Sequence, residues 1–472
     1  MDFHRLLKEI IMKTKIILFL LFLTINHYSQ VQLGPIAGAV TETSAVILIK
    51  TYSPDQEVII ELFTQDDVEN SIYSEAFITE EENYNYVKIP VNDLMPNTTY
   101  YYRAIVDEFP SRKWNSFQTF PEDKEYSFSF GFGSCQQSSW GKPDPEIFPV
   151  IANDTLRFFI QLGDWTYPDT TERKYGYRFN EKMDLLEKSY QSKYNNNYPF
   201  VSEVLSQMPV VYTYDDHDFA ANNSDGSDPA KGNSIWAYKT FFPHYELKNP
   251  DNGIWQSFTF GDVEFFVLDM RAQRNTGNDA FDENKKFSPP AGHSILAGYE
   301  ISGMNQRDWF FDELKKSTAK WKVIVSSVLF NPAYAKTTEL DSLPGDLWWF
   351  PSDAADKWAG YPEDVNALLN TIISNSIKNV FVISGDTHSS FIDDGKNSLI
   401  PEIGASNLDV NNSNLGKKLS SLGINIWNKG TYDEEGHTYG TVRFFFGEED
   451  YVLLEIINER KEIILSHRLD AE

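Results

Sequence analysis

Four short polar motifs hold most of the residues in this sequence that could do chemistry. They read Gly-Ser-Cys-Gln at 133–136, Gly-Asp-Trp-Thr-Tyr at 163–167, Asp-Asp-His-Asp at 215–218 and Gly-Asp-Thr-His at 385–388. Carboxylates, imidazoles, a thiol and a phenol are groups that bind metal ions and transfer protons. Together they predict a metal site, and hydrolysis is the chemistry that such a site most directly supports.

Three of the motifs directly follow apolar runs of β-strand character, at 127–132, 157–162 and 379–383. The carboxyl ends of strands in an α/β sheet meet at one edge, which is where enzymes of this class build their sites. We therefore expect Cys135, Asp164 and His388 to gather at one sheet edge.

Each motif taken alone also has a purely structural explanation. Cys135 is the single cysteine, so it forms no disulfide within the chain and is either an inert core residue or a ligand. Asp164 could bridge two metal ions and Tyr167 could bind a ferric ion, or both belong to an ordinary turn. Asp386 and His388 offer an oxygen and a nitrogen ligand, again within a turn.

The segment 210–225 gives the strongest indication, because an apolar strand runs there into acidic, imidazole and amide groups. Burying so many polar groups costs free energy unless a cation or a substrate satisfies them. The alternative is a solvated acidic loop. His217 lies between Asp216 and Asp218, where it could protonate a leaving group.

Composition excludes several classes of protein. The chain has 472 residues, of which 41% are hydrophobic and 15% aromatic, so it is globular and long enough for two or three units. Its net charge of -28 argues against nucleic acid as a stable partner, because phosphate backbones bind basic surfaces. A phosphate-bearing substrate would need bound cations to supply positive charge.

The N-terminus predicts export. Residues 1–29 read as a signal peptide, with Lys13 and Lys15 before an apolar stretch at 16–23 and cleavage expected after Ser29. Met12 is an alternative start, which would make 1–11 an upstream extension. The apolar stretch is too short to span a bilayer and no longer one follows. We therefore expect a periplasmic or extracellular protein without a membrane span.

The rest of the chain predicts two domains. Residues 31–120 alternate short β-like runs with turns, as in a β-sandwich of the immunoglobulin or fibronectin type, and 94–100 resemble the turn before a corner tyrosine. This domain either binds a partner or packs against the catalytic domain. Residues 121–472 alternate strands with helices, including helices at 179–194 and 305–318, which predicts an α/β sheet covered by helices.

Three strands are expected near the C-terminus, at 438–446, 451–457 and 462–467. We expect them to form the second sheet of a two-sheet sandwich.

The four motifs, with Leu-Asp-Met-Arg at 268–271 and Asp-Lys-Trp-Ala-Gly-Tyr-Pro at 356–362, resemble the PhoD-type alkaline phosphatases and phosphodiesterases of the calcineurin-like metallophosphoesterase superfamily. The resemblance runs from about residue 31 to the C-terminus. It implies a two-sheet metallophosphoesterase sandwich flanked by helices, preceded by a small all-β domain.

The resemblance also implies roles for single residues. Asp164 would bridge a ferric ion and a second cation, His217 would act as general acid or transition-state stabiliser, and Arg271 would contact phosphate. The ligands implied around Fe³⁺ are Cys135, Asp164, Tyr167 and His388. Those implied at the second site, which the family associates with Ca²⁺, are Asp216, Asn222 and Asp386.

The sequence departs from the wider superfamily at several of these positions. Cys135 replaces part of an Asp-x-His motif, Asp216 stands where relatives have asparagine, and Asp386 stands where they have histidine. Sulfur and oxygen thus replace nitrogen, which disfavours an all-zinc or all-manganese site. Many relatives also have a histidine after the strand at 321–330, and this chain has none, which leaves the second ligand set open.

These observations predict a secreted, metal-dependent hydrolase that cleaves phosphate monoesters, diesters or both through in-line attack by a metal-bound hydroxide. Its substrate would be a small molecule or a polymer. One alternative is a dedicated phosphodiesterase with phospholipase D-like activity on lipid head groups, wall polymers or nucleotides. Another is a surface binding protein that calcium stabilises and that catalyses nothing.

Overall fold

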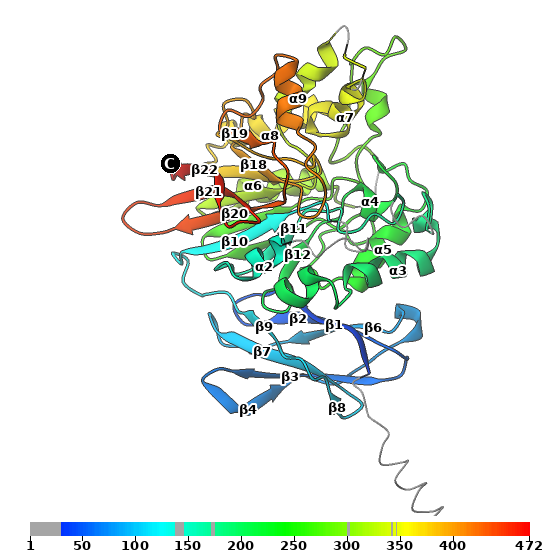
Figure 1. Cartoon of the computed structure of the whole chain (residues 1–472), viewed down its shortest axis with the longest axis vertical. Coiled ribbons are helices and arrows are strands. Elements are labelled where there is room, and N and C mark those ends of the chain that lie inside the picture. The colour runs from blue at the N-terminus through cyan, green and yellow to red at the C-terminus, as the bar shows by residue number, and fades with distance from the viewer. Residues whose placement is uncertain (1–29, 137–145, 171–174, 300–302, 341–342, 346) are drawn as a thin grey trace, which may run out of the picture.

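The computed structural model describes residues 30–136, 146–170, 175–299, 303–340, 343–345 and 347–472. The predicted signal peptide lies outside the described residues. The molecule is elongated, with a β-rich N-terminal part at one end and a larger body of strands and helices at the other (Figure 1). Within the described ranges, no helix is both long enough and apolar enough to cross a membrane.

The N-terminal part is all-β, as predicted. One of its sheets has six strands, in which inward and outward side chains alternate along β7 because one face is packed and the other is wet. Tyr100 accepts a hydrogen bond at its hydroxyl from the Met95 amide at 2.8 Å, which is the expected corner tyrosine. The strands of this sheet are β3 (Glu57–Thr64), β4 (Asp67–Tyr73), β5 (Phe77–Ile78), β7 (Thr99–Val106), β8 (Phe109–Pro110) and β9 (Asn115–Gln118).

A nine-stranded sheet runs through both parts of the molecule. Its order is β22 (Ile463–Asp470), β21 (Tyr451–Asn458), β20 (Thr438–Phe445), β10 (Phe128–Gly133), β11 (Phe159–Gln161), β12 (Val210–Tyr212), β1 (Val31–Gly38), β2 (Ala45–Thr51) and β6 (Tyr86–Val91). The central strands β10, β11 and β12 are parallel and in register. Their carboxyl ends therefore lie together.

A seven-stranded sheet packs against this one. Its order is β13 (Gln256–Phe260), β14 (Val263–Val267), β15 (Trp321–Val325), β16 (Val380–Ser384), β18 (Glu402–Ala405), β17 (Ser390–Asp393) and β19 (Gly430–Tyr432). Phenylalanines join the two sheets in one core, as where Phe130 meets Phe265 edge to face at 5.3 Å between ring centroids. The two-sheet sandwich is thus confirmed.

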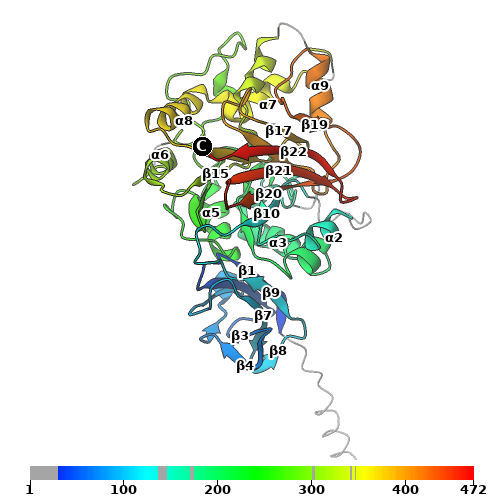
Figure 2. The same cartoon turned by 90° about the vertical axis from the view of Figure 1, so that its left-hand side faces the viewer.

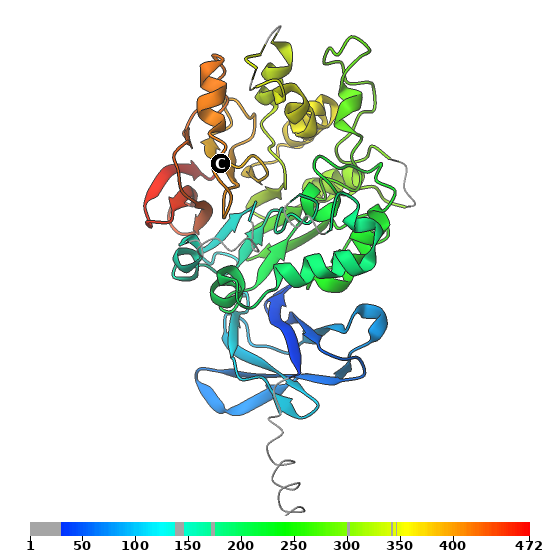
Figure 3. The same ribbon diagram turned by 45° about the vertical axis from the view of Figure 1, so that its right-hand side comes forward.

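Helices cover the outer faces of both sheets. The nine-stranded sheet is covered by α2 (Ile147–Ala152), α3 (Met183–Lys193) and α5 (Lys231–Phe241), and the seven-stranded sheet by α6 (Gln306–Lys316) and α8 (Pro362–Ser374). Figure 3 shows the green helices α3 and α5 above the blue N-terminal strands. The helices predicted at 179–194 and 305–318 are confirmed as α3 and α6, with a short η2 turn (Phe179–Glu181) before α3.

The prediction for the C-terminal strands is wrong in one respect. β20, β21 and β22 form, but β20 pairs with β10, so they extend the first sheet (Figure 2). Segments from the middle of the chain, 256–432, build the second sheet instead. Strand periodicity indicates that a strand exists, whereas its partner depends on contacts between distant segments.

The predicted boundary near residue 120 does not separate the sheets. β1 pairs in parallel with β12 at Gly38 and Val210, so strands on both sides of the boundary share one sheet. A side chain at Gly38 would begin 2.3 Å from the Pro243 carbonyl oxygen, so only glycine allows Pro243 to pack this closely on β1. Whether the two parts are separate domains stays a prediction.

His244 lies between the two parts and should make the protein sensitive to acid. Its Nε2 is 3.1 Å from the Lys88 ammonium. Burial is the main cause that lowers the pKa of His244 to about 4, and the positive charge of Lys88 is the second. In the unfolded chain the pKa of His244 is about 6.5, so the folded state disfavours protonation of this residue. The stability that depends on neutral His244 is therefore fully present above pH 6.5 and is lost as pH falls towards 4. We expect the free energy of unfolding to fall by up to about 3 kcal/mol over this pH range.

Urea unfolding of the wild type and of His244→Asn at pH 7, 5.5 and 4.5 checks this expectation. The difference in unfolding free energy between the two proteins should shrink as pH falls, because only the wild type loses the His244 contribution. An equal pH dependence in both proteins would contradict it.

Candidate metal centre

The four motif loops lie at one end of the sandwich because each follows the carboxyl end of a strand. The expectation of a single sheet edge is wrong for His388, because β16 belongs to the seven-stranded sheet and the other three strands to the nine-stranded sheet. Residues 134–136 follow β10, the loop at 162–167 follows β11, 213–215 follow β12, and 385–388 follow β16. Four candidate ligands adopt left-handed backbone conformations, with φ of 62° at Cys135, 52° at Asp164, 72° at Asp386 and 50° at His388. Such conformations are costly outside glycine and concentrate at functional sites.

Gly163 brings two of these loops into contact. Its φ is +100°, and a side chain there would begin 2.4 Å from the Cβ of Asp215. Only glycine meets both constraints, so the Gly-Asp turn after β11 packs directly on the Asp-Asp-His-Asp turn after β12. Asp164 is thereby placed beside Asp216 and His217.

Asp164 belongs to two groups of candidate ligands. The ligand atoms of Cys135, Asp164 and His388 all lie within 4.8 Å of one another, and so do those of Asp164, Asp216 and His217. Asp164 is 1% exposed, and no described group donates a hydrogen bond to its Oδ1. A buried carboxylate oxygen without a donor suits a cation, so these residues fit the implied metal site.

Tyr167 joins the first group through a hydrogen bond. Its hydroxyl lies 3.1 Å from the Nε2 of His388, and its ring contacts the His217 ring at 4.5 Å between centroids. Burial raises the pKa of Tyr167, and the neighbouring Asp164 and Cys135 raise it further. A strongly acidic metal ion would reverse this trend, because it stabilises a phenolate.

The other groups show the same excess of negative charge. Burial raises the pKa of Asp164 and of Cys135, and nearby carboxylates add to both shifts. Burial lowers the pKa of His388 to about 4, so its imidazole is neutral near pH 7 and has a lone pair to give. The set therefore combines acidic groups that would release their protons to a bound cation with one neutral nitrogen donor.

His217 is held by a partner that sequence reasoning missed. Its Nδ1 lies 2.8 Å from Oδ1 of Asp169, which is buried and whose Oδ2 accepts the backbone N–H of Asn222 at 3.2 Å. Burial lowers the His217 pKa, but Asp216, Asp164 and the bond to Asp169 more than offset it and raise the pKa well above its ordinary value. His217 is thus poised as a proton donor.

The residues predicted for the second site are only partly gathered. Asp216 lies in the second ligand group and accepts the His217 amide at 2.9 Å. Asp386 forms an ion pair with the buried Lys357. The Asn222 side chain is exposed. Binding of a second cation by these three residues stays a prediction.

Arg271 lies at the centre of a buried ionic network. Its Nε donates to Asp215 at 2.6 Å and its Nη1 to Asp356 at 3.1 Å, while Nη2 is 3.8 Å from Asp216. The arginine is fully buried. These bonds fix the loop that carries Asp216, and the predicted phosphate contact stays a prediction.

Asp169, Asp215 and Lys357 are the functional candidates that sequence reasoning did not single out. Asp215 and Lys357 belong to the motifs at 215–218 and 356–362, so motif position was an available signal. Asp169 lies two residues beyond its motif, and only the fold brings it to His217.

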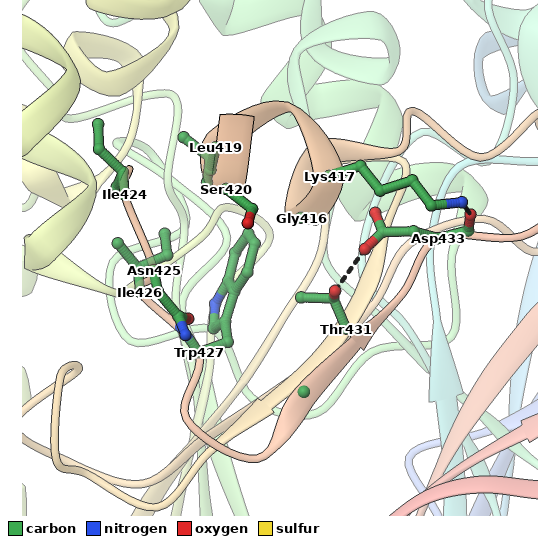
Figure 4. A pocket seen from close by; sticks show the side chains of 11 residues that line it. Gly416, Lys417, Leu419, Ser420, Ile424, Asn425, Ile426, Trp427, Thr431 and Asp433 are labelled. Carbon is green, nitrogen blue, oxygen red and sulfur yellow. Dashed lines mark hydrogen bonds between the residues drawn. The ribbon is translucent and has the colours of Figure 1, made fainter. Parts of the chain in front are cut away.

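A separate cavity of about 280 Å³ lies between α9 (Leu415–Ser421) and β19. Its lining includes Leu419, Trp427, Thr431 and Asp433 (Figure 4). None of the candidate ligands lines it. The cavity is therefore distinct from the metal centre.

Comparisons with known proteins point in one direction. Residues 130–422 match the family model described as PhoD-like phosphatase. Alkaline phosphatase D of Bacillus subtilis (strain 168) is 28% identical over 336 residues, which cover 65% of this chain and 53% of that protein. The chain thus matches about half the length of this curated relative.

Two solved structures share the fold. The structure of PhoD superposes with a TM-score of 0.68 at 19% identity, covering 95% of this chain and 94% of that one. A purple acid phosphatase from yellow lupin (Lupinus luteus) seeds superposes with a TM-score of 0.58 at 11% identity, covering 92% of this chain and 74% of that one. The match extends over both the N-terminal strands and the two-sheet body.

Proposed function

Because this chain belongs to the PhoD-like phosphatase family, we propose that it is an exported, metal-dependent enzyme that hydrolyses phosphate monoesters, diesters or both. The observation that carries this proposal is that Asp164 belongs to two groups of candidate ligands, one with Cys135 and His388 and the other with Asp216 and His217. Asp164 is buried, and no described group donates a hydrogen bond to its Oδ1.

We propose Fe³⁺ and Ca²⁺ as the cations. Thiolate, phenolate, carboxylate and imidazole donors from Cys135, Tyr167, Asp164 and His388 would hold the ferric ion, and the oxygens of Asp216, Asn222 and Asp386 would hold calcium. Bound cations of this kind polarise phosphoryl oxygens and lower the pKa of water. Other divalent ions would fit the oxygen ligands of the second site.

His217 would supply the proton that the leaving group needs. Asp169 holds its Nδ1 side, so the ring keeps one orientation and Nε2 is left for a substrate oxygen. Arg271 fixes the turn after β12 through Asp215 and would keep Asp216 and His217 in place beside Asp164. These residues thus divide the work into proton donation and alignment.

Elemental analysis of the purified mature chain, paired with turnover assays, tests the proposal. We expect iron near one per chain and hydrolysis of a mono-aryl or a bis-aryl phosphate that rises with added calcium. The ratio of the two rates decides between a phosphatase and a dedicated diesterase. A folded protein with no metal and no turnover would overturn the proposal and favour a binding role.

A further inference from the structure

Lys193 is a fully buried charge that the proposed chemistry does not use. It is the last residue of α3, and its ammonium group contacts Asp218 and lies 2.9 Å from the Thr166 hydroxyl. Removing an ammonium ion from water costs several kcal/mol unless it is paired. Neither Asp218 nor Thr166 belongs to the candidate ligand set, so Lys193 contacts residues next to the ligands and not the ligands themselves.

The Asp218 carboxylate joins the backbones of two ligand-bearing loops. It accepts the Trp165 amide at 3.2 and 3.3 Å through its two oxygens, and the Thr166 amide at 3.4 Å. It also accepts the Asp215 amide at 3.3 Å. Trp165 follows Asp164 and Asp215 precedes Asp216, so one carboxylate spans the turns that carry both of these candidate ligands.

We propose that Lys193 is a positioning residue of the metal centre, which holds the Asp218 carboxylate against both turns so that Asp164 and Asp216 stay within reach of the same cation. The inference rests on the proposed function, because it takes these turns to bind metal. Without the ammonium group, Asp218 is a buried carboxylate that can turn away from the amides towards water. The two turns then lose their common anchor.

The same helix offers a matched control. Lys50 of β2 is also buried, at 5% exposed, and pairs with Glu187 of α3 at 3.1 Å. This pair attaches α3 to the N-terminal strands and holds no ligand-bearing turn. Lys50→Met therefore removes a buried ammonium group that pairs with α3 without touching Asp218.

The experiment compares wild type, Lys193→Met and Lys50→Met. We measure metal bound per chain by elemental analysis after dialysis against a fixed chelator concentration, and the calcium concentration that gives half-maximal turnover. Both variants should melt below the wild type. Only Lys193→Met should keep less than half of the metal and need roughly tenfold more calcium, whereas saturating metal should restore most of its kcat.

A double variant keeps the test valid if Lys193→Met does not fold. Lys193→Met with Asp218→Asn leaves no unpaired buried charge, so it should melt above the single variant. It should still bind metal weakly, because the amide has one acceptor oxygen where the carboxylate has two, so at most two of the four backbone bonds to Asp218 remain. Wild-type metal retention in either folded variant would overturn the inference, and so would equal metal loss in Lys50→Met. Lack of turnover in the wild type would count against the proposed function, while metal retention would still test Lys193.

Discussion

Asp164→Asn should reduce phosphoester turnover on the order of a thousandfold while the protein stays folded. Asp164 contributes to both candidate ligand groups, so its loss weakens the binding of either cation. Electrostatic stabilisation by a bound metal is worth several kcal/mol in the transition state, and about 4 kcal/mol corresponds to that factor. Steady-state turnover on an aryl phosphate and metal content per chain are the measurements.

Stability separates this effect from unfolding. Burial raises the pKa of Asp164, which means that its charge destabilises the metal-free fold, so the neutral amide should not lower the melting temperature of chelator-treated protein. Asp364→Asn is the control, because Asp364 is buried and accepts Ser294 at 2.6 Å and the Ile295 amide at 2.8 Å. Burial also raises the pKa of Asp364, so its amide should likewise be tolerated, and this variant should keep both its metal content and its turnover. Unchanged turnover in folded Asp164→Asn would sink the bridging role.

His217→Gln should lower turnover by about 10²- to 10⁴-fold, the range typical of a lost general acid. The loss should depend on the leaving group. An alkoxide needs a proton as it departs, whereas a nitrophenolate leaves without one, so alkyl esters should suffer most. The measurement is kcat on a series of phosphate esters whose leaving groups differ in pKa.

Asp169→Asn tests how His217 is held. The amide keeps the size of the side chain but removes the charged oxygen that bonds to Nδ1 at 2.8 Å. Turnover should therefore fall roughly tenfold below that of the wild type, which is a smaller loss than in His217→Gln. The dependence on the leaving group should change in the same direction. A uniform loss across all leaving groups in both variants would exclude proton donation and point to a purely structural role for His217.

The candidate site was largely predictable from sequence because strand ends are local features. The apolar runs before Cys135, Asp164 and Asp386 are confirmed as β10, β11 and β16. The loops after β10 and β11 meet because these parallel strands are in register, whereas the loop after β16 comes from the other sheet of the sandwich. The family motifs added the roles of individual residues. Neither argument needed contacts between distant side chains.

The features that sequence reasoning missed all depend on such distant contacts. Asp169 pairs with His217 across 48 residues, and Lys193 pairs with Asp218 across 25. No periodicity marks the partner of a buried charge, since the choice is made by tertiary packing. The sequence prediction for the C-terminal strands was wrong for the same reason, because it did not place β20 beside β10.

The pairing of β1 with β12 limits how this architecture can be taken apart. A catalytic fragment beginning at residue 121 would keep every candidate ligand but would uncover the flank of β12, whose backbone groups meet β1 at Val210 in the intact protein. Uncovered strands recruit other chains and promote aggregation. The N-terminal strands are thus part of the sheet that carries the candidate ligands and cannot be exchanged or removed freely. Gene fusions or truncations should retain them even where only hydrolysis is wanted.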